Sequence, residues 1–84
     1  MREYDFAVIL APTVELSEVL EEALFASGSD DGMPWVTGGV VGIGFARQAD
    51  SLESAIRSAI ADVQRAGCAV AKVEITAEAL AASN

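Results

Sequence analysis

The chain has 84 residues, of which 13 are acidic, 5 are basic and none is histidine, so its formal net charge is −8. A chain of this length forms one domain and buries only about 60–65% of the surface that it exposes when unfolded, which excludes a large substrate cavity. The charge disfavours direct contact with nucleic acid, and the lack of histidine removes the usual general base and imidazole-bound metal.

The first expected elements are a strand and a helix. Residues Tyr4 to Leu10 alternate in a β-branched and aromatic pattern that predicts a strand with Phe6, Val8 and Leu10 on one face. Thr13 is placed to cap a helix that runs to about Ser27. The helix is expected to bury one apolar stripe, formed by Leu16, Val19, Leu20, Ala23 and Leu24.

Residues 28–47 predict a hairpin. Gly28 suits the end of the first helix, and Pro34 in the short strand Met33 to Thr37 favours the edge of a sheet. The pair Gly38-Gly39 matches a tight two-residue turn, whose central positions take positive φ. The returning strand is Val40 to Arg47, and its side chains expected beneath the helices are Val41, Ile43 and Phe45.

The second half predicts a helix and a last strand. Asp50 and Glu53 form a capping box, and Gly67 ends the helix. Its expected buried stripe is Leu52, Ala55, Ile56, Ala59, Ile60 and Val63. The last strand is expected from Ala69 to Ile75, with inward side chains Ala71, Val73 and Ile75.

The order of elements is therefore β-α-β-β-α-β. Two right-handed crossovers that share a sheet predict an α+β fold, a ferredoxin-like sandwich with a four-stranded antiparallel sheet and two helices on one face. We expect a single domain over residues 1–76 and a short tail over residues 77–84.

The glycine-rich stretch VTGGVVGIGFARQ has two functional alternatives. A phosphate-binding loop needs its glycines between a strand and a helix N-terminus, whereas Gly38-Gly39 is expected between two strands. An RNA-recognition module stacks bases on exposed aromatic rings of its sheet, and only Phe45 could do so here. We favour glycines of a hairpin and a flat sheet, with RNA binding through Phe45 as a distant alternative.

The chain offers little for catalysis. Cys68 has no imidazole partner and is expected in the core, and Lys72 is expected to form a solvated pair with Glu74. Asp30 and Asp31 lack the spacing of a calcium-binding loop. We therefore expect no enzyme, no metal site and no cofactor.

Acidic residues dominate the first helix and the turn after it. Six acids occur in 17 residues without a basic one: Glu15, Glu18, Glu21, Glu22, Asp30 and Asp31. Such carboxylates either form an ordinary solvated helix face or imitate phosphates toward a basic groove. Trp35 either anchors an interface or caps the core, and in the first case we expect it to be contiguous with the acidic residues.

From Tyr4 to Ile75 the chain resembles a small domain that precedes the helix-turn-helix in many bacterial DNA-binding proteins. The matching stretches are ELSEVLEEALFASGSDDG, GGVVGIGFARQADSLESAIRSAIADVQRAG and VAKVEI. The resemblance implies the fold and carries no catalytic motif. The chain stops where the DNA-binding helices of that family would begin, so a repressor acting by itself is not implied.

By size, charge and sandwich fold the chain is also similar to several phage-encoded anti-CRISPR proteins, which block a CRISPR effector by occupying a nucleic-acid-binding surface. We expect a non-enzymatic inhibitor in the cytoplasm of a bacterial host, with a basic nucleic-acid-binding protein such as a CRISPR effector subunit as its partner. The expected partner-binding residues are Glu15, Glu18, Glu21, Glu22, Asp30, Asp31 and Trp35. The alternative is a dimerisation or ligand-sensing domain of a bacterial regulator or antitoxin, which associates as a homodimer.

Overall fold

The computed structural model describes residues 2–75 of the chain. Its elements are β1 Arg2–Leu10, α1 Glu18–Ala26, β2 Gly32–Thr37, β3 Val40–Ala49, α2 Leu52–Arg65 and β4 Val70–Ile75. Their order is the one that the sequence predicted. The tail expected over residues 77–84 lies outside the described residues, as do positions 1 and 76 of the expected domain.

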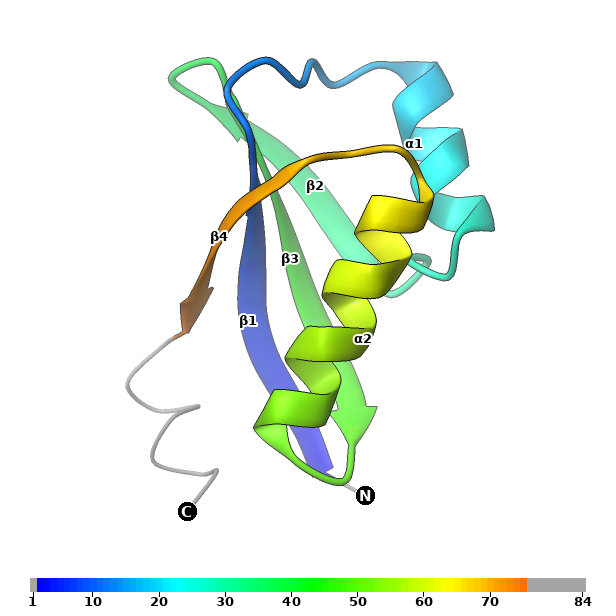
Figure 1. Cartoon of the computed structure of the whole chain (residues 1–84), viewed down its shortest axis with the longest axis vertical. Coiled ribbons are helices and arrows are strands. Elements are labelled where there is room, and N and C mark those ends of the chain that lie inside the picture. The colour runs from blue at the N-terminus through cyan, green and yellow to red at the C-terminus, as the bar shows by residue number, and fades with distance from the viewer. Residues whose placement is uncertain (1, 76–84) are drawn as a thin grey trace.

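The four strands form one antiparallel sheet in the order β2-β3-β1-β4. Strand β3 lies between β1 and β2, and β1 lies between β3 and β4, so each helix connects two strands that a third strand separates. Both helices lie on one face of the sheet (Figure 1), and we call the opposite side the open face. The predicted α+β fold of the ferredoxin-like type is therefore confirmed.

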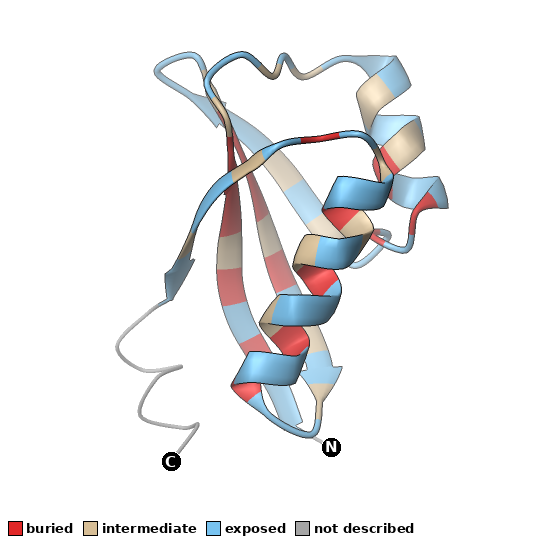
Figure 2. Cartoon of the chain, in the orientation of Figure 1, coloured by how far each residue is buried: buried red, intermediate tan, exposed pale blue. Residues whose placement is uncertain are grey.

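The core lies between the sheet and α2. Phe6 of β1 and Phe45 of β3 pair across the strands with ring centroids 5.5 Å apart. The buried side chains of α2 are Leu52, Ala55, Ala59 and Val63, whereas α1 buries only Leu24 (Figure 2). Helix α1 is thus held by less apolar contact than α2. Cys68 belongs to this core, as predicted, and burial raises the pKa of its thiol.

Both helices begin later than predicted. The hydroxyl of Ser17 accepts a hydrogen bond from Leu20 N at 3.2 Å, so the prediction that Thr13 caps α1 was wrong. Leu16 suggested the earlier start because it fits the helical stripe, but it packs against the core from the irregular segment before α1. Likewise Ser51, rather than Asp50, caps α2 through a 3.1 Å bond from Ser54 N.

Three side chains expected inside are exposed, and one of them is Ile75, which lies on the edge strand β4 and is 41% exposed although it pairs with the buried Phe6. Val19 is 76% exposed, because α1 turns Leu20 and Leu24 toward the sheet instead. Ala71 is exposed because the pairing of β4 with β1 shifts register between Ile9 and Leu10. After that shift Val70 takes the place opposite Leu10.

The hairpin was predicted correctly. Gly38 and Gly39 have φ angles of 57° and 78°, the left-handed values that a tight two-residue turn requires. Strand β2 lies at an edge of the sheet, where Pro34 is tolerated. Val41, Ile43 and Phe45 are 1%, 1% and 3% exposed, as expected for side chains beneath the helices.

An ion cluster around Arg47 joins β3 to α2 and to the turn after α1. The guanidinium donates two hydrogen bonds to Asp31, from Nε at 2.9 Å and from Nη2 at 2.7 Å. It also donates to Asp62 Oδ2 and to Ser58 Oγ, both at 3.0 Å, and to the carbonyl of Gly28 at 3.0 Å. Its side chain is only 11% exposed. We call Asp31, Arg47, Asp62 and Arg65 the Arg47 cluster, since Arg65 completes it with a 2.9 Å bond to Asp62.

The hydrogen bonds from Arg47 hold the pKa of the Asp31 carboxyl below its ordinary value of 3.8, although burial opposes this. The same bonds raise the pKa of Arg47. Because the folded pKa of Asp31 is the lower one, this carboxyl stabilises the fold fully at pH values above 3.8. The contribution is lost as the pH falls through the folded pKa.

Replacing Arg47 by methionine is expected to lower the free energy of unfolding by about 2–3 kcal/mol, because Asp31 and Asp62 lose their shared partner. Asp31→Asn should lower the free energy of unfolding by a smaller amount, and this variant should lose less stability in acid than the parent does. Urea unfolding at pH 7 and pH 3 measures both effects. Arg57→Met is the matched control, because this arginine is 77% exposed and its pair with Glu53 contributes below about 0.5 kcal/mol. Equal stability of the two arginine variants would contradict the structural role of Arg47.

Candidate functional site

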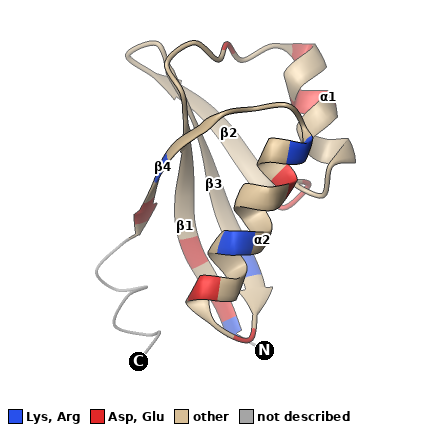
Figure 3. Ribbon diagram, in the orientation of Figure 1, with Lys and Arg blue, Asp and Glu red and all other residues tan. Residues whose placement is uncertain are grey.

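Five carboxylates form an exposed acidic surface that extends from the segment before α1, along α1, to the turn after it. We define this acidic surface by the residues Glu15, Glu18, Glu21, Glu22 and Asp30, all of which are exposed. Within residues 2–75, none of the five forms an ion pair. Helix α1 carries acidic but no basic residues, whereas α2 carries both signs (Figure 3). The repulsion between these carboxylates is therefore not relieved by neighbouring bases.

Asp31, the sixth acidic residue expected at the site, has a different environment. Its carboxylate forms a bidentate ion pair with Arg47 and is 34% exposed. The pair neutralises its charge and directs its oxygens toward the guanidinium of Arg47. Asp31 therefore positions the turn and adds little to the field of the acidic surface.

An exposed phenylalanine lies within the acidic surface. Phe25 follows Glu18 by seven residues, Glu21 by four and Glu22 by three, so all four side chains share one side of α1. Its side chain is 71% exposed. Sequence reasoning missed Phe25, although the spacing to the glutamates was available as a signal.

Trp35 lies on the open face of the sheet. It pairs with Gly42, whose neighbours Val41 and Ile43 point toward the helices. Its indole covers Gly42, since a Cβ atom added there would lie 2.7 Å from Cε2 of Trp35. Gly42 therefore provides the space that the indole occupies. Alternation along β2 places Trp35 on the side away from α1, and of the acidic residues expected beside it Asp31 lines the same hollow of the surface.

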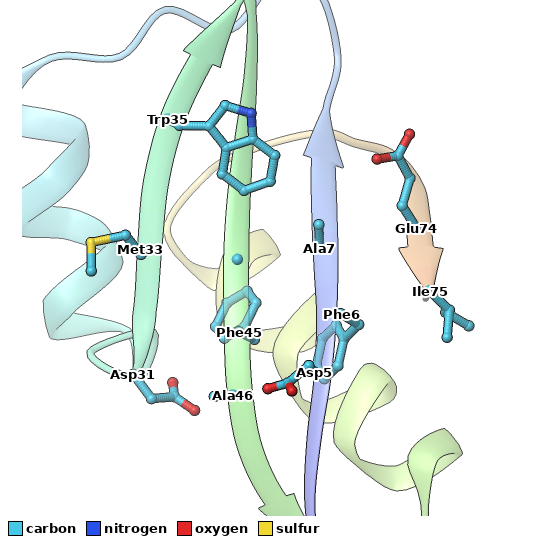
Figure 4. A pocket seen from close by; sticks show the side chains of 11 residues that line it. Asp5, Phe6, Ala7, Asp31, Met33, Trp35, Phe45, Ala46, Glu74 and Ile75 are labelled. Atoms are coloured by element: carbon cyan, nitrogen blue, oxygen red, sulfur yellow. The ribbon is translucent and has the colours of Figure 1, made fainter. Parts of the chain in front are cut away.

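Beside Trp35 the open face is hollowed into a shallow groove of about 930 Å³. We call it the open-face groove, and the residues that shape it are Ala7, Met33, Trp35, Gly44, Ala46 and Ile75. Ala7 and Gly44 pair across β1 and β3, so the floor is almost bare backbone. The carboxylates of Asp5 and Asp31 lie near Ala46, at the end away from Trp35 (Figure 4).

The remaining candidate residues have environments that suit structural roles. Phe45 is 3% exposed and stacks on Phe6, so its ring is not available to bases, which removes the support for the RNA alternative. Lys72 lies 3.3 Å from Glu74, as predicted.

Among residues 2–75, no group of three or more Cys, Asp or Glu side chains is arranged to hold a metal ion. The described part of the chain also has no helix with the length and apolarity needed to cross a membrane.

Gly42→Ala is expected to displace the indole of Trp35, because the new methyl group would overlap it. The emission maximum of Trp35, the single tryptophan, should shift to longer wavelength, and the free energy of unfolding should fall by about 1 kcal/mol. Gly44→Ala is the matched control, since its Cβ would meet Trp35 at an ordinary 3.5 Å. The same emission spectrum in both variants would show that the indole does not rest on Gly42.

No family model matches the chain, and searches of curated proteins and of solved structures found no match either. The described part of the chain has two candidate functional surfaces, the acidic surface and the open-face groove.

Proposed function

We propose that the protein is a non-enzymatic inhibitor that acts by binding another protein. Its acidic surface docks on the basic, nucleic-acid-binding surface of that partner. The partner is a CRISPR effector subunit in the cytoplasm of a bacterial host. The inhibitor blocks it by DNA mimicry, in the manner of phage-encoded anti-CRISPR proteins. The observation that carries the proposal is the row of exposed carboxylates around Phe25 on α1, which form no ion pair with any residue from 2 to 75.

The arrangement of charge supports this proposal physically. Glu18 and Glu22 are four residues apart on one helix, a like-charge spacing that destabilises the helix by a few tenths of a kcal/mol. An opposing row of lysines and arginines would turn that cost into attraction. Such complementarity mainly raises the association rate and makes binding sensitive to salt.

Phe25 supports an interface rather than a merely solvated helix face. A phenyl ring that is 71% exposed contributes little to the fold and loses unfavourable contact with water when a partner covers it. Aromatic side chains surrounded by polar residues are frequent energetic centres of interfaces. Phe25 therefore takes the role of anchor that the sequence suggested for Trp35.

The triple variant Glu18→Gln, Glu21→Gln, Glu22→Gln is expected to bind a purified CRISPR effector complex at least about tenfold more weakly at low salt. The affinity of the parent should fall as salt rises, and DNA should compete with it. Phe25→Ser should also weaken binding, but should leave the salt dependence unchanged. Titration calorimetry at two salt concentrations measures these effects across a panel of effector complexes.

A matched control removes the same number of charges elsewhere: Glu3→Gln, Asp50→Asn and Glu53→Gln, all at exposed positions. It should lose much less affinity, because the removed charges lie outside the acidic surface. If the two triple variants bind equally well, net charge alone matters and the proposed surface is wrong. If the parent binds no effector complex in the panel, this class of partner is wrong.

The open-face groove favours a second candidate function, a dimerisation or ligand-sensing domain of a bacterial regulator or antitoxin. Met33 is 74% exposed and Trp35 is 37% exposed beside a floor of small residues. Exposed apolar side chains gathered on a flat surface are typical of places where another surface packs. A second copy of the chain covering this face would bury both side chains.

For this second function we expect a dimer whose formation depends on concentration and is unchanged in the α1 triple variant. The emission of Trp35 should shift to shorter wavelength as the dimer forms, because its indole leaves water. Sedimentation equilibrium and fluorescence over the same concentration range measure this. A monomer with constant emission would contradict association through the open face.

A further inference from the structure

A small hollow lies beside the acidic surface, between the end of α1 and the edge strand β2. Its volume is about 120 Å³. Leu24 and Ile43, both buried, contribute its apolar part, and the polar residues that line it are Glu21, Ser29 and Asp30. Phe25 lines it as well. The hollow is thus open to a partner that docks on the acidic surface.

Ser29 gives this hollow an unexplained feature. The residue is 4% exposed, and among residues 2–75 its Oγ is a buried side-chain oxygen without a hydrogen-bond partner. Its backbone is fully used, because its N donates to Leu24 O at 2.9 Å and its O accepts from Gly32 N at 3.0 Å. Nearby Ser27 is also buried, but its hydroxyl donates to Leu24 O. Buried polar groups in folded proteins normally have a hydrogen-bond partner, so the unused hydroxyl of Ser29 is an exception that a bound ligand would remove.

We infer that the hollow receives an arginine side chain of the partner protein. This inference rests on the proposed function and names the chemistry of the contact. A guanidinium has five N–H donors in one plane, enough for the carboxylates of Glu21 and Asp30 and for the hydroxyl of Ser29. Its flat face packs on a phenyl ring, which Phe25 provides. The volume equals that of about four water molecules, which suits a head group of one carbon and three nitrogens.

The Arg47 cluster shows that this fold already binds a guanidinium with the same set of groups. Arg47 bonds two carboxylates and the hydroxyl of Ser58, and its Cζ lies 4.9 Å from the centroid of the Phe45 ring. The hollow offers the same kinds of group, namely two carboxylates, a serine hydroxyl and a phenyl ring. Arginine suits this set better than lysine, because an ammonium is more strongly hydrated and lacks a flat face.

The inference is tested by titrating the ¹⁵N-labelled chain with N-acetylarginine amide and following backbone amide shifts by NMR. N-acetyllysine amide tests the shape of the cation, and N-acetylcitrulline amide is the uncharged match of arginine. We expect saturable shifts centred on Phe25, Ser29 and Asp30 with arginine, weaker ones with lysine and none with citrulline. Shifts of equal size for arginine and lysine, spread along α1, would overturn the inference.

Two variants test the residues of the hollow. Ser29→Ala and Glu21→Gln should each weaken arginine binding about fivefold, because each removes a hydrogen bond to the guanidinium. Glu3→Gln, which removes one exposed charge on β1, should leave it unchanged. If Ser29→Ala binds arginine as tightly as the parent, the Oγ bonds water instead and the inference fails.

The outcome is separable from that of the proposed function. If arginine does not occupy the hollow while the α1 triple variant still loses partner binding, the inference fails and the proposed function stands. If arginine occupies the hollow while the triple variant keeps full partner binding, the hollow is a guanidinium site and the proposed docking surface is wrong.

Discussion

The ion cluster around Arg47 positions most of what this chain presents to a partner. One guanidinium, 11% exposed, is bonded to the turn after α1 and to α2 from its place on β3. Helix α1 buries only Leu24 against the core, so its position depends strongly on the turn that follows it. Arg65 reinforces that turn with a 2.8 Å bond to the carbonyl of Ser27. The cluster thereby places the acidic surface and fixes Asp31 at one end of the open-face groove.

The pairing of charges explains why the negative field is local. The basic residues Arg47, Arg57, Arg65 and Lys72 all form ion pairs with nearby carboxylates. These pairs neutralise much of the second half of the chain and remove Asp31 from the acidic surface. The five carboxylates of the acidic surface form no ion pair among the described residues, so they carry a large part of the net charge of −8. A positively charged protein would therefore be attracted toward α1 at distances within the screening length of the solvent.

Strong local patterns in the sequence predicted the fold, and contacts distant in sequence escaped prediction. Alternation in β1 and the Gly38-Gly39 turn determine their elements locally, and both were confirmed. The predicted start of α1 was wrong because Leu16 packs on the core without being helical. Sequence periodicity does not distinguish such a tertiary contact from a position on a helix. The face of the sheet on which Trp35 lies depends on strand pairing, so the open-face groove was not predicted. The roles of Arg47 and Ser29 depend on how the turn after α1 packs against α2 and β3, so the hollow was not predicted either. The exposure of Phe25 was within reach, because its spacing from the glutamates places it among them.

The proposed binding would be coupled to the fold through the turn formed by residues 27–31. On its inner side Asp31 and the carbonyl of Gly28 hold the guanidinium of Arg47, and on its outer side Ser29 and Asp30 line the hollow. A cation bound outside would relieve repulsion between Asp30 and Glu21 and would satisfy the hydroxyl of Ser29. A cation that binds this arrangement of the turn, and does not bind the unfolded chain, adds its binding free energy to the stability of the turn. The proposed contact would therefore stabilise the same segment that holds Arg47.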